Sequence, residues 1–348
     1  MAEKKILFYD TKEYDKDFFN EINKKYKFEI DYFNEHLNEK TVSFSKGYDV
    51  VCVFVNDIVN KKVIDALIKN GVKLIALRCA GYNNVNLQSV YGNIHVVRVP
   101  GYSPYAVAEH AVALILGLNR KTHRAYYRTR DGNFSINGLM GFDLHGKTAG
   151  IIGTGQIGKC AINILKGFGM NILAYDILPD KNYAKKNKIS YVSLDKLYKD
   201  SDIISLHCPM TKDTFHLIDK QTMKKMKKGV MIINTGRGGL INTGHLIEML
   251  KKGHVGSAGL DVYEEESDYF FEDLSSSVIR DDVLARLLTF SNVLITSHQG
   301  FFTKEALTNI ADTTLSNVQE FFKGGYLKNE ICYKCNKVCQ KKKNKRCF

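Results

Sequence analysis

The 348 residues of this chain, 44% of them hydrophobic and 25% charged, suit a folded protein of two ordinary domains. The longest apolar runs, such as residues 111–118, are far shorter than a membrane-spanning helix. We therefore expect no association with a membrane. The apolar stretch near the N-terminus is too short for a secretion signal, so we expect a cytoplasmic protein.

The formal net charge of +13 is unevenly distributed. Eight basic residues and one acid lie between Lys328 and the C-terminus, and the body shows no basic stripe interleaved with aromatic residues. A solvated basic tail is therefore favoured over a nucleic-acid-binding surface.

Short apolar segments alternate with amphipathic stretches along the chain. The predicted strands are residues 6–9, 50–55, 74–78, 96–99, 148–152, 172–175, 203–206, 230–233, 256–260 and 293–296. A long helix is predicted to start after Ser103, because Pro104 suits a first helical turn and apolar residues follow at helical spacing. This alternation predicts an α/β protein with parallel sheets, and the long helix divides two strand series.

A glycine pattern, G-x-G-x-x-G, follows the strand at 148–152 directly. Gly153 permits the tight turn, Gly155 lets the backbone approach a pyrophosphate, and Gly158 allows close packing of helix and strand. The helix N-terminus, at Gln156 and Ile157, supplies N–H donors and a positive dipole. The pattern predicts a dinucleotide site.

The next strand ends in Asp176, where such sites carry an acid. A carboxylate there accepts hydrogen bonds from the ribose hydroxyls and repels a 2′-phosphate. The following residues, 177–179, provide no arginine in compensation, so NAD is favoured over NADP.

Three ionisable residues follow strands in the second half of the chain: Arg237, Glu266 and His298. The carboxyl ends of parallel strands line the ligand crevice, so these residues are expected to share one site. His298 can give a proton near neutral pH, and Glu266 beside it would favour the imidazolium. Arg237 can bridge a carboxylate and a carbonyl oxygen. The set suits reduction of a 2-keto acid by a hydride donor.

Cysteines are expected to play no catalytic part, because hydride transfer needs no nucleophile. Four lie in the body in apolar or motif surroundings and are expected to be reduced and buried: Cys52, Cys79, Cys160 and Cys208. The others lie in the tail: Cys332, Cys335, Cys339 and Cys347. Their spacing could bind zinc, but a single C-x-x-C pair among lysines favours a disordered extension without a metal.

Taken together, these motifs resemble the D-2-hydroxyacid dehydrogenase family, and within it the fermentative D-lactate branch. The resemblance runs from about Lys5 to Glu330, and the stretches at 54–57, 78–85, 99–104 with 108–110, 153–158 and 261–266 carry it. It implies two doubly wound, Rossmann-like domains with a cleft between them. The substrate domain would be residues 1–102 plus 300–330, the NAD domain 103–299, and the tail 331–348.

The resemblance also implies roles for individual residues. The substrate would contact Ala80, Gly81, Tyr102 and Arg237, and His298 would act as the acid/base. The cofactor would contact the following: Gly153, Gly155, Gln156, Ile157, Gly158, Asp176, Cys208, Pro209, Thr235, Gly236 and Asp261. Homo-oligomers, commonly dimers packed through the cofactor domain, are usual in such enzymes.

The resemblance favours reduction of pyruvate to D-lactate with NADH. Two alternatives stay open. One is a related reductase acting on glyoxylate, hydroxypyruvate or a branched keto acid. The other is an NAD-sensing corepressor-type binding protein, which the complete set of Arg237, Glu266 and His298 disfavours.

Overall fold

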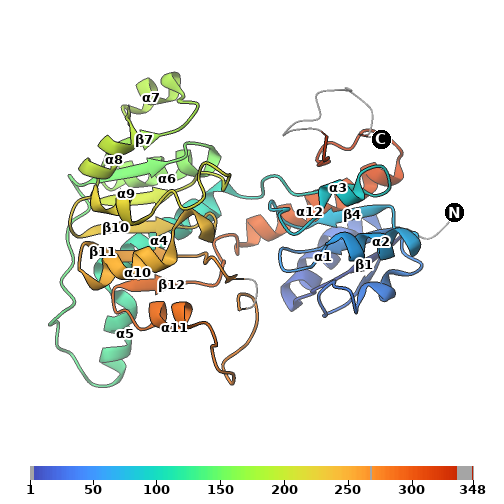
Figure 1. Ribbon diagram of the computed structural model, residues 1–348, viewed down its shortest axis with the longest axis horizontal. Helices are drawn as coiled ribbons and strands as arrows, with labels where there is room; N and C mark the ends of the chain where they lie inside the picture. Colours follow the sequence, from blue (N-terminus) through green and yellow to red (C-terminus); the bar gives the residue numbers. More distant parts are fainter. Residues whose placement is uncertain (1–3, 267–268, 335–346, 348) are drawn as a thin grey trace. The chain divides into compact units, whose positions relative to one another are not determined.

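The computed structural model describes residues 4–266, 269–334 and 347, and its chain divides into two compact units (Figure 1). Unit 1 comprises Met1–Ser103 and Phe302–Phe348, and unit 2 comprises Pro104–Phe301. Each unit is built on a parallel sheet covered by helices, as the alternation of strands and helices predicted. Within the described residues, no helix has both the length and the apolar character needed to cross a membrane.

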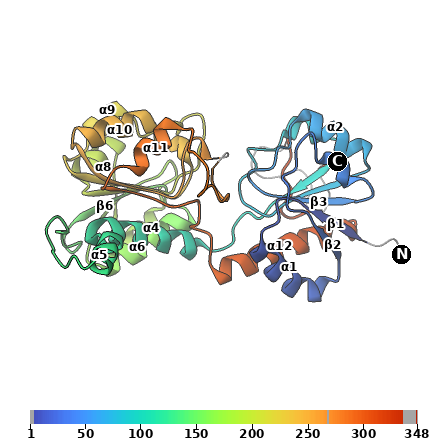
Figure 2. The same ribbon diagram turned by 90° about the horizontal axis from the view of Figure 1, so that it is seen from below.

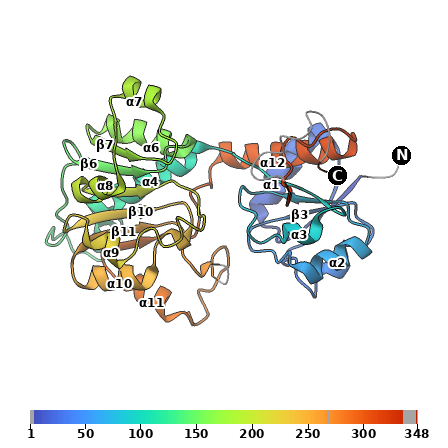
Figure 3. The same cartoon turned by 45° about the horizontal axis from the view of Figure 1, so that its top comes forward.

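Unit 1 contains a five-stranded sheet in the order β2-β1-β3-β4-β5. Its strands are β1 (Lys5–Phe8), β2 (Glu29–Tyr32), β3 (Val50–Val53), β4 (Leu74–Leu77) and β5 (His95–Val97). Helices α1 (Glu13–Tyr26) and α12 (Lys304–Phe322) cover one face, and α2 (Lys61–Lys69) and α3 (Leu87–Val90) lie on the other (Figures 2 and 3). A short 3₁₀ turn, η1 (Val42–Ser45), precedes β3.

Unit 2 contains a seven-stranded sheet in the order β12-β11-β10-β9-β6-β7-β8. Its strands are β6 (Thr148–Ile152), β7 (Asn171–Tyr175), β8 (Ser190–Tyr191), β9 (Ile203–Leu206), β10 (Val230–Asn234), β11 (Val255–Leu260) and β12 (Val293–Ile295). One face carries α4 (Pro104–Arg120), α5 (Thr122–Arg130) and α6 (Gln156–Gly167), and α7 (Lys181–Asn187) follows β7. The other carries α8 (Leu194–Asp200), α9 (Lys220–Lys224), α10 (Thr243–Lys251) and α11 (Asp282–Leu288) (Figure 2).

The alternation of side chains along the strands separates two cores in unit 2. Along β10, Val230 and Ile232 belong to one apolar cluster, whereas Met231 and Ile233 belong to the cluster on the opposite face. The strand order reverses between β6 and β9, and ligands of open α/β sheets bind beside such a reversal. The Gly153 loop follows β6 and therefore lies at that point.

Ten of the twelve strands that the described residues form were predicted, with ends shifted by a residue or two, and two edge strands were missed. β2 alternates exposed and half-buried side chains, so it has no apolar run. β8 has only two residues. Edge strands bury less apolar surface than central ones, which leaves a weaker signal in the sequence. The predicted long helix is confirmed as α4, which begins at Pro104.

The segment after α12 returns to the edge of the unit 1 sheet. The N–H of Ile331 donates to the carbonyl oxygen of Val96 at 2.8 Å. The Glu330 carboxylate, only 3% exposed, lies 2.6 Å from Nδ1 of His95. The predicted tail begins at residue 331, whereas this pairing carries the body through Ile331. Cys335 and Cys339, two of the cysteines whose spacing could bind zinc, lie outside the described residues.

Two truncations test where the body ends. A chain ending at Lys334 should keep the melting temperature of the full chain. A chain ending at Lys328 should melt about 5–10 °C lower, because it loses the buried carboxylate that faces His95. Calorimetry of both proteins checks this. Equal melting temperatures would contradict a structural role for the segment around Glu330.

Candidate active site

The glycine loop of unit 2 has the geometry of a dinucleotide cradle. Gly153 has a φ of +93°, and a Cβ there would lie 2.5 Å from the N atom of Cys208. A Cβ at Gly158 would lie 2.0 Å from the carbonyl oxygen of Gly153, so only glycine lets α6 pack so closely. A Cβ at Gly155, in contrast, would have no neighbour within 4 Å, which leaves space for a phosphate. Gln156 and Ile157 begin α6 directly after it.

Asp176 lies immediately after β7, and the glycine loop holds its carboxylate. The N–H of Thr154 donates to Oδ2 at 2.7 Å, the Thr154 hydroxyl donates at 3.0 Å, and the N–H of Leu178 donates to Oδ1 at 2.9 Å. Burial raises the pKa of Asp176, but these hydrogen bonds outweigh it and hold the pKa below its ordinary value. The acid is therefore ionised at neutral pH. Sequence reasoning missed Thr154 and Tyr191, whose hydroxyls lie 2.8 Å apart.

The burial of the four body cysteines agrees only partly with the prediction that all four are buried. Cys52 and Cys79 are buried, but Cys160 and Cys208 are only half-buried, and Cys208 packs at the edge of an apolar cluster. Burial raises the pKa of Cys208 to about 11, so this residue is a neutral thiol near pH 7. Cys208 and Pro209 follow β9, beside the glycine loop. A nucleophilic role for Cys208 is thereby disfavoured.

Arg237 follows β10 and begins the 3₁₀ turn η2 (Gly238–Leu240). Its Nη1 donates to the carbonyl oxygen of Gly236 at 2.7 Å. Within the part of the chain that the structure describes, the guanidinium pairs with no carboxylate. Thr235, beside it, is 7% exposed. A Cβ at Gly238 would lie 2.1 Å from the carbonyl carbon of Tyr263, so the loops after β10 and β11 are in contact.

Glu266 and His298 form a pair at the ends of the neighbouring strands β11 and β12. Nδ1 of His298 lies 3.0 Å from Oε1 of Glu266, and the two side chains are 17% and 21% exposed. The other carboxylate oxygen of Glu266 accepts the N–H of Tyr263 at 3.1 Å. Since Glu266 engages Nδ1, the Nε2 atom of His298 is the one left to exchange a proton with a ligand.

Asp261 follows β11 and is 1% exposed. Its Oδ2 accepts the N–H of Gly300 at 2.8 Å, and its Oδ1 accepts the N–H of Gln299 at 2.9 Å. The residue predicted to contact the cofactor thus binds the loop that bears His298.

The remaining predicted site residues belong to unit 1. Ala80 and Gly81 follow β4, where Nη1 of Arg98 donates to the carbonyl oxygen of Ala80 at 2.7 Å. The thiol of Cys79 donates to the carbonyl oxygen of Gly81 at 3.3 Å. The carbonyl oxygen of Tyr102 accepts from Nδ2 of Asn309, on α12, at 2.7 Å.

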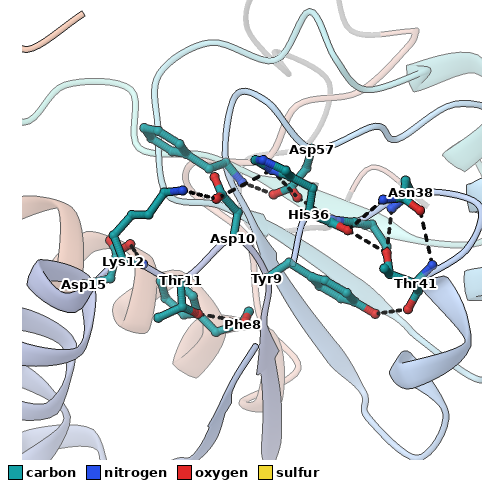
Figure 4. A network of polar contacts seen from close by, with 12 residues as sticks. Phe8, Tyr9, Asp10, Thr11, Lys12, Asp15, His36, Asn38, Thr41 and Asp57 are labelled. Atoms are coloured by element: carbon teal, nitrogen blue, oxygen red, sulfur yellow. Dashed lines mark hydrogen bonds and ion pairs between the residues drawn. The ribbon is translucent and has the colours of Figure 1, made fainter. Parts of the chain in front are cut away.

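Unit 1 also contains a buried charge cluster that sequence reasoning missed, and Figure 4 shows its acids Asp10, Asp15 and Asp57. Arg78, 2% exposed, donates to the carbonyl oxygen of Asp10 at 2.6 Å and lies 3.4 Å from Asp15. Asp57 accepts the N–H of Phe54 at 2.6 Å. Burial raises the pKa of Asp57 to about 6, although Arg78 opposes the shift. The cluster follows β1, β3 and β4 and fixes the turns there. Its only sequence signals were Asp57 in the 54–57 stretch and Arg78 in the 78–85 stretch.

A nucleotide cradle, an ionised acid after β7, an acid–histidine pair after β11 and β12, and an arginine after the adjacent β10 are together typical of a nicotinamide-dependent dehydrogenase. Residues 112–300 match the family model described as "D-isomer specific 2-hydroxyacid dehydrogenase, NAD binding domain". The chain belongs to the D-isomer specific 2-hydroxyacid dehydrogenases, and its cofactor is NAD.

Relatives and solved structures agree with this assignment. The chain is 51% identical to D-lactate dehydrogenase of Escherichia coli over 94% of this chain and 99% of that one. The apo-structure of D-lactate dehydrogenase from Escherichia coli matches with a TM-score of 0.87 at 48% identity, covering 94% of this chain and 99% of that chain. A structure described as the pyruvate reductase of Chlamydomonas reinhardtii matches with a TM-score of 0.90 at 44% identity, with the same two coverages.

Proposed function

We propose that this chain reduces pyruvate to D-lactate with NADH. The observation that carries the proposal is the His298–Glu266 pair at 3.0 Å, at a strand end next to that of Arg237. The relatives named D-lactate dehydrogenase support the choice of substrate. Unit 2 would bind the cofactor, and unit 1 would supply backbone groups at Ala80 and Gly81 for the substrate carboxylate.

Each side chain has a definite part in this reaction. The cofactor supplies a hydride to the ketone carbon. His298 gives a proton from Nε2 to the ketone oxygen, and Glu266 at Nδ1 keeps the ring oriented. Arg237 binds the carboxylate and the ketone oxygen with its fork of donors, and Tyr102 lies near the substrate. The net reaction consumes one pyruvate, one NADH and one proton.

Steady-state kinetics with NADH and a panel of keto acids tests the proposal. Pyruvate should give the highest kcat/KM, above glyoxylate, hydroxypyruvate and a branched keto acid. A higher kcat/KM for one of those three would assign the chain to another reductase of the same family. Absence of reduction with all four, despite NADH binding, would favour a binding protein.

The ribose-binding role of Asp176 is tested by coenzyme preference. Asp176→Ala should raise the ratio of NADPH to NADH kcat/KM about tenfold or more, because a carboxylate facing a 2′-phosphate is removed. Asp180→Ala is the matched control, since this nearby acid caps α7 and pairs with Lys159. Equal kcat/KM values with NADH and NADPH for the unmodified enzyme would show that Asp176 does not determine the coenzyme preference.

We also propose that the chain forms a homodimer or higher oligomer through unit 2. The segment from α5 to β6 exposes a set of large apolar side chains: Tyr126, Tyr127, Phe134, Ile136 and Met140. Ile136 is 81% and Met140 is 88% exposed. The segment is nevertheless held in place, because Nζ of Lys121 donates to the carbonyl oxygen of Gly138 at 2.9 Å and Nη1 of Arg128 donates to that of Asn137 at 2.7 Å. An ordered apolar surface of this kind suits a second copy of the chain.

Sedimentation analysis tests this assembly. The unmodified protein should sediment as a dimer or larger, and the double change Ile136→Glu with Met140→Glu should dissociate it. Val278→Asp, at a residue 85% exposed elsewhere in unit 2, should have no effect. A monomeric unmodified protein, or a double variant that still assembles, would contradict the proposal.

We propose the cytoplasm as the location, because the buried free thiol of Cys52 favours a reducing compartment.

A further inference from the structure

The Asp261 carboxylate joins three segments of unit 2. In addition to the N–H groups of Gln299 and Gly300, it accepts the hydroxyl of Thr296 at 2.6 Å. Its Oδ1 also lies 3.2 Å from Nε2 of His110, which is on α4. Burial raises the pKa of Asp261, but the hydrogen bonds from His110 and Thr296 outweigh it and keep the pKa below its ordinary value. The acid is therefore an ionised acceptor.

The hydrogen-bond network determines which nitrogen of His110 carries the proton. Nε2 of His110 lies 2.9 Å from Oγ1 of Thr296. The single hydroxyl proton of Thr296 is used on Asp261, so Thr296 can only accept from His110. Nε2 of His110 must therefore be protonated, and it faces both the hydroxyl oxygen and the carboxylate.

These contacts surround the backbone of His298. Its N–H donates to the carbonyl oxygens of Asp261 at 2.8 Å and of Thr296 at 3.0 Å. His298 has a φ of 49°, a left-handed conformation that a side chain adopts only when its surroundings impose it. Thr296 on one side of His298 and Gln299 on the other are both bound to the Asp261 carboxylate. The cluster thus fixes the loop that aims the imidazole.

The cluster also lies near both points where the chain passes between its units. His110 is in the second turn of α4, which begins at the Ser103–Pro104 boundary. Gly300 precedes Phe301, the last residue of unit 2, and a Cβ at Gly300 would lie 3.0 Å from Oδ2 of Asp261 and 3.6 Å from Cδ2 of His110. This close approach leaves the loop little freedom to shift once His110 is in place.

We propose that His110 is a positioning residue for catalysis: through Thr296 and Asp261 it holds the loop that presents His298. The inference rests on the proposed role of His298 as the proton donor. His110 touches neither reacting group in this account, so its removal should slow the chemical step and leave NADH binding unchanged. Measurable reductase activity in the unmodified enzyme tests the function separately, before any His110 variant is made.

The experiment compares two substitutions at one position. His110→Leu removes the Nε2 donor, whereas the amide of His110→Gln can place an N–H near the same point. We expect His110→Leu to lower kcat about 10- to 100-fold, with KM changing by less than about threefold, and His110→Gln to recover most of the loss. The deuterium isotope effect from labelled NADH should rise in the leucine variant. His254→Leu is the matched control, because Nε2 of His254 lies 2.8 Å from the carbonyl oxygen of Met223, outside the cluster.

Two further measurements separate positioning from general destabilisation. Thr296→Val should reproduce the kinetic loss and Thr296→Ser should not, since only the former removes the hydroxyl. A crystal structure of His110→Leu should show His298 displaced from Glu266, with NADH affinity by fluorescence unchanged. Normal kcat in His110→Leu, an equal loss in His110→Gln, or a loss explained by weaker NADH binding would each overturn the proposal.

Discussion

Replacing His298 with alanine is expected to lower kcat for pyruvate reduction by about 100-fold or more, with little change in NADH affinity. The side chain is the proton donor, and its Nδ1 atom is already engaged by Glu266 at 3.0 Å. Alanine removes the proton source but leaves the glycine loop and Asp176 intact. Stopped-flow turnover together with fluorescence titration of NADH separates the two effects.

His254→Ala provides the control for this variant, because it deletes a half-buried imidazole that hydrogen-bonds Met223. It should keep near-normal turnover. A His298→Ala enzyme with turnover close to normal would remove this residue from the mechanism, whatever its distance from Glu266.

The second large effect is expected at Arg237. Arg237→Gln should lower kcat/KM for pyruvate by about 100- to 1,000-fold, because two charge-assisted hydrogen bonds to the substrate are lost. Arg237→Lys should recover only part of this loss, since an ammonium keeps the charge without the planar fork. NADH binding should be unaffected, because the cradle that begins at Gly153 is formed by other residues.

Arg280→Gln is the control for Arg237, since it removes a guanidinium from an exposed position in the same unit. It should leave kcat/KM unchanged. If Arg237→Gln leaves the KM for pyruvate and kcat unaltered, the guanidinium does not bind the substrate.

The sequence predicted those features that depend on local pattern. Buried central strands such as β4 have continuous apolar runs, and residues at strand ends such as Asp176 and His298 are placed by topology alone. The glycines of the cradle were predictable because each has a distinct steric reason, which the close approaches of Gly153 and Gly158 bear out.

Features that depend on contacts across the fold were not predicted. Arg78 was visible only as part of a motif, yet it pairs with two acids of another segment, Asp10 and Asp15. His110 likewise appeared only as one letter in a stretch that resembles the family. Its partner Asp261 lies 3.2 Å away but is distant in the chain, and no local periodicity indicates such a pairing.

The most direct test of the central claim is the configuration of the product. Purified enzyme supplied with pyruvate and NADH should form one D-lactate for each NADH oxidised, as measured by chiral chromatography. The reverse reaction should proceed with D-lactate and NAD and not with L-lactate. Formation of L-lactate, or NADH binding without any oxidation in the presence of pyruvate, would contradict the account.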